Sequence, residues 1–96
     1  MSYVFSPEAR KDLNELWEFI AQDSLQAADR IVTAIEKACG KLSRSPLMGH
    51  LRPDLTDKAV RFWGVSSYLI VYRAETKPLE VVRILSGYRD LAGLLQ

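Results

Sequence analysis

The chain has 96 residues and a mass of 10.9 kDa, a length that supports one hydrophobic core and excludes a second catalytic domain. Hydrophobic residues make up 48% of the sequence and charged residues 26%, which is typical of a globular protein and excludes a disordered or low-complexity chain. The formal net charge of +1 excludes the large cationic excess of a general nucleic-acid-binding protein. We therefore expect a single domain over residues 1–96.

Compartment and cofactors are constrained by what the sequence lacks. No apolar run approaches the roughly 20 residues that cross a bilayer, and the first residues do not form a signal peptide. The single cysteine, Cys39, has no intrachain disulfide partner, and with the single histidine, His50, it cannot complete a zinc site. The motifs of P-loop enzymes, dinucleotide-binding enzymes and metalloproteases do not occur either. These features predict a cytoplasmic protein without a membrane segment, a metal or another cofactor.

The first 43 residues predict a short strand and two helices. Residues 3–5 are apolar and end at Ser6-Pro7, a pair that favours the start of a helix. Apolar residues then recur at helical spacing on both sides of a second capping pair, Asp23-Ser24. They are Ala9, Leu13, Leu16, Trp17 and Ile20, then Ala28, Ile31, Val32, Ile35, Ala38, Cys39 and Leu42. The link is short, so we expect an antiparallel helical hairpin with a shared apolar face.

The second half of the chain predicts a sheet. Residues 43–57 contain Pro46, Gly49 and Pro53 and show no sustained periodicity, so we expect a long loop. Residues 59–65, 68–74 and 79–85 are rich in β-branched and aromatic residues and predict a three-stranded antiparallel meander, whose edge the N-terminal strand can join. Leucines at 91, 94 and 95 predict one or two helical turns over 88–95. The result is a two-layer α+β fold in which the hairpin covers the sheet.

Cationic side chains concentrate in the second half of the chain. Residues 1–43 carry five basic against seven acidic side chains, whereas residues 44–96 carry eight against five. Arg61, Arg73 and Arg83 fall in the three predicted strands, and Tyr88 and Arg89 follow the last one. An open sheet face lined with these arginines could bind RNA, and Arg61, Arg83 and Tyr88 could supply metal-independent cleavage. The alternative is structural ion pairing of the arginines with nearby carboxylates: Glu75, Glu80 or Asp90.

Four aromatic residues are candidates for contacts with a partner. Phe19 lies off the main helical stripe that contains Trp17. Phe62 and Trp63 are adjacent in a predicted strand, so one of them must face away from the core. Exposed aromatic side chains often anchor protein partners. The candidate binding residues are therefore these four, together with two arginines, Arg73 and Arg89.

Several short motifs occur in an order that resembles a known family. They are Ala27-Ala28-Asp29-Arg30-Ile31, then Leu42, Ser45-Pro46, Gly49 and Arg52, then Val60-Arg61, then Tyr68-Leu69-Ile70-Val71-Tyr72-Arg73, and finally Val82-Arg83-Ile84-Leu85-Ser86-Gly87-Tyr88-Arg89-Asp90. This ordered set, with the chain length and the order of predicted elements, resembles the ParE branch of the RelE/ParE toxin superfamily. The resemblance covers nearly the whole chain.

The resemblance implies a RelE/ParE-like fold and the toxin half of a type II toxin-antitoxin pair. Such toxins are neutralised by a cognate antitoxin, here ParD-like, that wraps the helical hairpin and the sheet, and operator DNA is bound only through the antitoxin. ParE-type members inhibit DNA gyrase and so DNA replication, and no catalytic residue follows from that activity.

RelE-type members of the superfamily instead cleave messenger RNA on the ribosome. Arg61 and Arg83 are similar to two arginines of those nucleases, and Tyr88 to their C-terminal tyrosine. The near-neutral charge and the absence of a cluster of strand lysines favour gyrase inhibition over this alternative. Ser86 stands where many ParE-like chains have a histidine. A third hypothesis is a relic that only binds its antitoxin.

Overall fold

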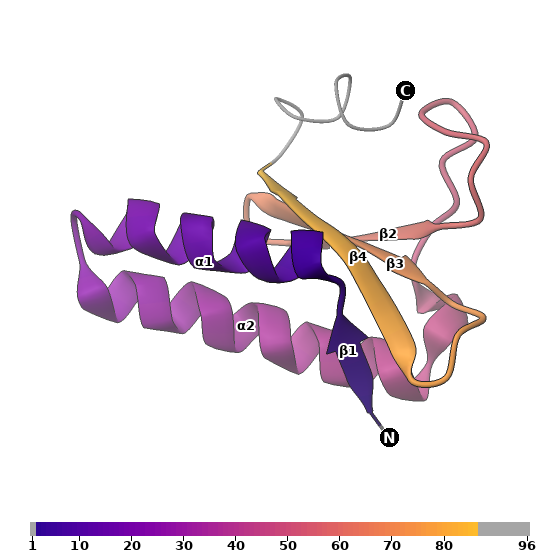
Figure 1. Cartoon of the computed structure of the whole chain (residues 1–96), viewed down its shortest axis with the longest axis horizontal. Helices are drawn as coiled ribbons and strands as arrows, with labels where there is room; N and C mark the ends of the chain where they lie inside the picture. The colour runs from indigo at the N-terminus through magenta and orange to yellow at the C-terminus, as the bar shows by residue number, and fades with distance from the viewer. Residues whose placement is uncertain (1, 87–96) are drawn as a thin grey trace.

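The computed structural model describes residues 2–86 and contains two α-helices and four strands in this part of the chain. In chain order they are β1 (Tyr3–Phe5), α1 (Pro7–Ala21), α2 (Leu25–Arg44), the short 3-10 helix η1 (Pro46–Met48), β2 (Arg61–Val65), β3 (Tyr68–Arg73) and β4 (Leu79–Ser86). Figure 1 shows α1 and α2 lying side by side as a hairpin. The predicted α+β fold is confirmed, whereas the helix predicted over 88–95 lies outside the described residues.

Both helices begin at the serines that the sequence pattern indicates. Ser6 precedes α1, and its Oγ accepts a hydrogen bond from the Ala9 N–H at 3.0 Å. Ser24 does the same for α2, where its Oγ accepts from the Ala27 N–H at 3.1 Å. Each side chain satisfies one of the backbone donors that a helix leaves unpaired in its first turn. Only three residues separate α1 from α2, and this short link forces the chain to turn back.

The four strands form one sheet in the order β1-β4-β3-β2. β2, β3 and β4 make the predicted antiparallel meander, and β1 pairs with β4 in parallel at the edge of the sheet. The pairing of β3 with β4 is interrupted once, because Val71 lies opposite Arg83 whereas Tyr72 lies opposite Val81. Val82 is therefore an extra residue in β4, and this β-bulge bends the strand beside α1.

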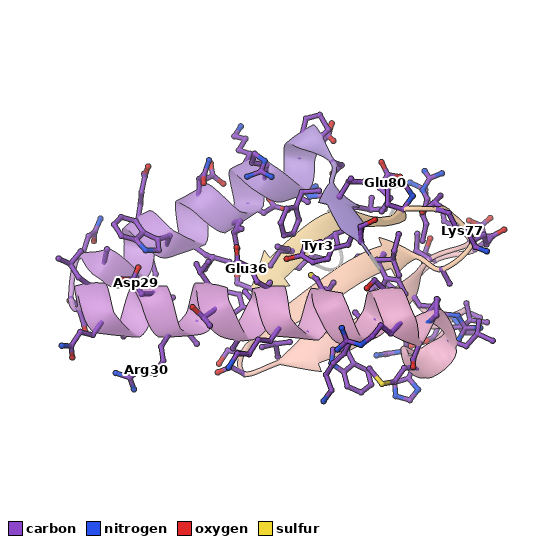
Figure 2. All side chains as sticks on the ribbon, turned by 90° about the horizontal axis from the view of Figure 1, so that it is seen from below. Tyr3, Asp29, Arg30, Glu36, Lys77 and Glu80 are labelled. Atoms are coloured by element: carbon purple, nitrogen blue, oxygen red, sulfur yellow. The ribbon has the colours of Figure 1, made fainter. Side chains whose placement is uncertain are left out.

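The main core lies between the helical hairpin and one face of the sheet. Its fully buried members include Ile35 and Leu42 of α2 with Ile70, Tyr72 and Val81 of the strands. In Figure 2 the helices cover the strands, and Tyr3 of β1 lies above α2 close to Glu36. Burial, with Cys39 and Glu36 nearby, raises the pKa of Tyr3. The hairpin thus covers the sheet as predicted.

The other face of the sheet carries a second, smaller core. Val60, Phe62, Val71 and Leu85 are buried there, and Leu55 from the preceding loop packs against them. The prediction of a long loop without any element over residues 43–57 is wrong in two respects. α2 continues to Arg44, and η1 follows. Beyond η1, His50 exchanges two backbone hydrogen bonds with Phe62, of 2.9 and 2.8 Å, so the chain pairs briefly with β2.

Candidate functional site

Arg83 is held by a carboxylate on the first helix. Its Nε and one terminal nitrogen donate to the two oxygens of Asp12 at 2.7 and 2.8 Å, and the Ile84 N–H donates to the same carboxylate at 3.0 Å. The Asp12 side chain is 11% exposed and that of Arg83 is 27% exposed. A bidentate pair in such a shielded place is among the stronger ionic contacts of a protein. The pair ties α1 to β4 beside the bulge. Asp12 is not one of the carboxylates that the sequence suggested as a partner for Arg83.

Arg61 and Arg73 are engaged elsewhere. Arg61 donates a hydrogen bond of 2.9 Å to the carbonyl oxygen of Gly49. Arg73 lies opposite Glu80 in the sheet, and the two form an exposed ion pair of 3.4 Å. Glu80 was one of the carboxylates expected to pair with an arginine, and this contact is confirmed.

The three strand arginines do not line one open face. Trp63 packs against the main core, so Arg61, two residues earlier in β2, points to the side of the helices. Val71 belongs to the second core, so Arg73, two residues later in β3, points to the opposite side. Arg83 is turned toward α1 by its pairing with Asp12. The described strands therefore do not bring these arginines onto one open face, as the RNA-binding alternative required, and Tyr88 and Arg89 lie outside the described residues.

A buried tyrosine fastens the segment after α2 to the sheet. The Tyr72 hydroxyl donates to the Pro46 carbonyl at 2.6 Å and accepts from the Gly49 N–H at 2.9 Å. Burial raises the pKa of Tyr72, which keeps the hydroxyl protonated and able to donate. Glycine is required at position 49 because a Cβ there would overlap the ring of Tyr72.

The fastened segment presents apolar side chains that the sequence pattern did not single out. Leu47 is 73% exposed and Leu51 is 56% exposed, while the ring of His50 stacks on that of Trp63 with 6.4 Å between centroids. The sequence did contain a signal for these exposed leucines. They fall in a loop rich in proline and glycine, where no helical or strand periodicity would place them in a core.

The four candidate aromatic residues have different environments. Phe19 is exposed, whereas Trp17 is half-buried and donates from Nε1 to Asp29 across the hairpin at 2.9 Å. Phe62 does face away from the main core, but it is buried in the second core. Trp63 is half-buried against the main core. Phe19 is therefore the most accessible anchor of the four.

A groove of about 270 Å³ lies between α1 and the adjoining ends of β3 and β4. Leu16, Phe19, Tyr68 and Ile84 supply apolar and aromatic surface. Further lining residues are polar or acidic: Asp12, Glu15 and Ser86. The groove thus combines apolar surface with a few polar groups, which is the composition of many ligand-binding sites.

The remaining reactive groups of the described chain offer little chemistry. Burial, with the Glu36 carboxylate nearby, raises the pKa of the Cys39 thiol to about 12, so this cysteine is protonated and inert near neutral pH. Among residues 2–86, no group of three or more His, Cys, Asp or Glu side chains is placed to hold a metal ion. In the same part of the chain, neither helix is long and apolar enough to span a membrane.

The fold and the distribution of its side chains define a small two-layer α+β protein with a helical hairpin on a four-stranded sheet and apolar side chains presented at its surface. The family described as the ParE toxin of the type II toxin-antitoxin system parDE matches residues 3–91, and the chain belongs to this family. The resemblance seen in the sequence motifs is confirmed. The protein is thus the toxin component of a type II toxin-antitoxin system.

A solved structure agrees with this assignment at the level of the fold. It is the structure of the chromosomal ParDE toxin-antitoxin system from P. aeruginosa, and the chain is 20% identical to it with a TM-score of 0.74. The similarity covers 91% of this chain and 96% of that one. No curated protein matches the sequence significantly.

Proposed function

We propose that this toxin inhibits DNA gyrase, and so DNA replication, and that a ParD-like antitoxin encoded with it holds it inactive. The observation that carries the proposal is the match to the ParE toxin family over residues 3–91. Gyrase inhibition is the role of that family. The proposal places the protein in the cytoplasm, where gyrase acts on chromosomal DNA.

The positions of the arginines support binding rather than RNA cleavage. A metal-independent ribonuclease needs cationic groups that converge on the phosphate whose charge grows in the transition state. In residues 2–86, Arg83 is paired with Asp12, and Arg61 and Arg73 point to opposite sides of the sheet. The ribosome-dependent nuclease that would use Arg61, Arg83 and Tyr88 is therefore the less supported activity.

The antitoxin is proposed to contact the surface shared by the hairpin and the sheet. Phe19 is the exposed aromatic side chain on α1, and Trp17, Trp63, Arg73 and Arg89 are the other candidate contacts. The near-neutral charge of the toxin gives little attraction to phosphates, so binding to operator DNA is assigned to the antitoxin.

The decisive experiment is a gyrase supercoiling assay with the purified chain, with and without its antitoxin. We expect loss of supercoiling and accumulation of cleaved DNA, both reversed by the antitoxin. Toeprinting of translated messages is run in parallel. Unchanged supercoiling at micromolar excess of toxin contradicts the proposal, and codon-linked cuts made by the native toxin would establish the nuclease instead. Normal growth of cells that express the chain alone would instead support the third hypothesis, a toxin relic that only binds its antitoxin.

A further inference from the structure

The outer side of α2 carries a row of cationic side chains, which we call the basic stripe. Its members are Arg30, Lys37, Lys41 and Arg44, and all of them are exposed. At about 100° per residue they fall within about 60° of arc, on the side of the helix opposite its buried residues. From Arg30 to Arg44 the stripe extends about 21 Å at the standard helical rise. The structure describes α2 throughout, and none of its acidic residues falls within this arc.

The acidic residues of α2 lie toward the first helix instead. Asp29 accepts a hydrogen bond from Trp17 of α1, and Glu36 lies close to Tyr3. Figure 2 shows Arg30 pointing away from α1, whereas Asp29 and Glu36 lie on the side of α2 that faces it. Within residues 2–86, no side chain of the basic stripe forms an ion pair with a carboxylate. The described part of the molecule therefore leaves the charge of the stripe available to a partner.

The stability of the helix does not explain the basic stripe. Lys41 and Arg44 lie in the last turn of α2, where a cation interacts favourably with the helix dipole. Arg30 and Lys37 lie further from the C-terminus, and the dipole effect does not extend beyond the terminal turn. The outer side of α1, by contrast, exposes basic and acidic residues together. The row of a single charge is thus a feature of α2 that needs another reason.

The composition of the basic stripe favours a polyphosphate over a protein surface. Protein interfaces depend on a few aromatic or large apolar anchors. The other residues of α2 within the arc are small or polar: Gln26, Thr33 and Ala34. The backbone of a nucleic acid is bound mainly by arginine and lysine, with amide and hydroxyl side chains as further donors. The residue types of the stripe match this second kind of site.

We propose that the basic stripe of α2 contacts the phosphate backbone of duplex DNA. The net charge of +1 makes this contact weak for the toxin alone, so it operates where another protein holds the toxin next to DNA. The choice of duplex DNA rests on the proposed function, because gyrase binds the DNA that it supercoils. None of the proposed antitoxin contacts belongs to α2, so the stripe is a separate surface.

Fluorescence anisotropy with a labelled DNA duplex of mixed sequence, at low salt, tests the contact without gyrase or antitoxin. The stripe variant is Lys37→Gln/Lys41→Gln, and the matched control is Lys11→Gln/Lys58→Gln, which removes the same charge from exposed positions elsewhere. We expect the stripe variant to bind at least fivefold more weakly than the native chain and the control to bind less than twofold more weakly. Equal losses in the two variants, or no binding by the native chain, overturn the proposal.

The dependence on salt counts the phosphate contacts. Each contact contributes about 0.9 to the slope of the logarithm of affinity against the logarithm of salt concentration. Four contacts therefore predict a slope of about −3.6 for the native chain and about −1.8 for the stripe variant. Equal slopes for these two proteins contradict the contact.

Competition identifies the class of partner. Polyglutamate at the same total charge is expected to displace the DNA less well than unlabelled duplex DNA does. Displacement that is equally strong would assign the basic stripe to an acidic protein, and tighter binding of duplex RNA would assign it to RNA. Either result overturns the proposal.

The supercoiling assay separates this inference from the proposed function. We expect the stripe variant to inhibit gyrase several-fold less than the native toxin and the control variant to inhibit it equally. Full inhibition by the stripe variant overturns the role of the stripe and leaves the proposed function intact. A native toxin that binds DNA through the stripe without inhibiting gyrase would instead contradict the proposed function alone.

Discussion

At the scale of single residues, the most consequential contact is the pair between Asp12 and Arg83, which are 71 positions apart. The same carboxylate also accepts a hydrogen bond from the Ile84 N–H. One side chain of α1 therefore binds both the Arg83 side chain and the backbone of β4 beside its bulge. Loss of Arg83 would leave a carboxylate that is only 11% exposed without its cation. A loss of toxicity on mutation of Arg83 therefore has a structural explanation that must be tested before a catalytic one.

We predict that Arg83→Ala lowers the free energy of unfolding by about 2 kcal/mol, because the shielded Asp12 carboxylate loses its partner. Arg73→Ala is the matched control and should cost about 0.5 kcal/mol, since the Arg73–Glu80 pair is exposed. Urea denaturation of the purified variants measures both. Equal effects of the two substitutions would show that the Asp12–Arg83 pair contributes no more than a surface pair.

The buried Cys39 thiol predicts a loss of stability at alkaline pH. The folded state holds the thiol proton up to about pH 12, whereas the unfolded state releases it near the ordinary pKa of 9.0. The contribution of this group to stability is therefore complete below pH 9 and is lost as the pH rises from 9 to 12. Cys39→Ala removes the titration and should show a shallower decline over this range in denaturation experiments at a series of pH values. Parallel declines for both proteins would contradict the assignment to Cys39.

At the scale of elements, Ser6 serves two structures at once. Its Oγ caps α1, its hydroxyl donates to the Val82 carbonyl at 2.7 Å, and its N–H donates to the Val81 carbonyl at 2.9 Å. Ser24 caps α2 through a single side-chain contact with Ala27. Capping by these serines was predictable from the sequence because it is local. The bonds from Ser6 to β4 join residues more than 70 positions apart, and no local pattern indicates them.

We predict that Ser6→Ala lowers the free energy of unfolding by about 2 kcal/mol, because it removes a helix cap and leaves the Val82 carbonyl without its donor. Ser24→Ala, which removes a cap alone, should cost about 1 kcal/mol. Thermal and urea denaturation compare the two variants. A larger loss for Ser24→Ala would mean that the contact between Ser6 and β4 adds nothing to the cap.

At the scale of the whole molecule, a chain of 96 residues builds two small cores on the two faces of one sheet and still exposes Phe19, Leu25, Leu47 and Leu51. A protein of this size buries a modest fraction of its surface, so a partner that binds only the folded state adds a sizeable increment to a small net stability. Stabilisation by a partner is consistent with the proposal that the toxin is held in a complex with its antitoxin.

We predict that a ParD-like antitoxin raises the melting temperature of the toxin in a concentration-dependent way. At an antitoxin concentration 100 times the dissociation constant, the expected stabilisation is about 2.7 kcal/mol. Differential scanning calorimetry measures the shift, with an unrelated antitoxin as the control. An unchanged melting temperature, together with a failure to co-purify, would contradict the proposed partner.

The sequence by itself determined the helices, the strands, their caps and the family, because periodicity and capping act over a few residues and the family motifs extend along the chain. Tertiary structure alone decided the parallel pairing of β1 with β4, the bulge at Val82, the second core and the partner of Arg83. The arginines illustrate the difference. Their positions in strands were readable, but the side of the sheet each one faces and the group each one meets depend on strand register and on residues distant in the chain.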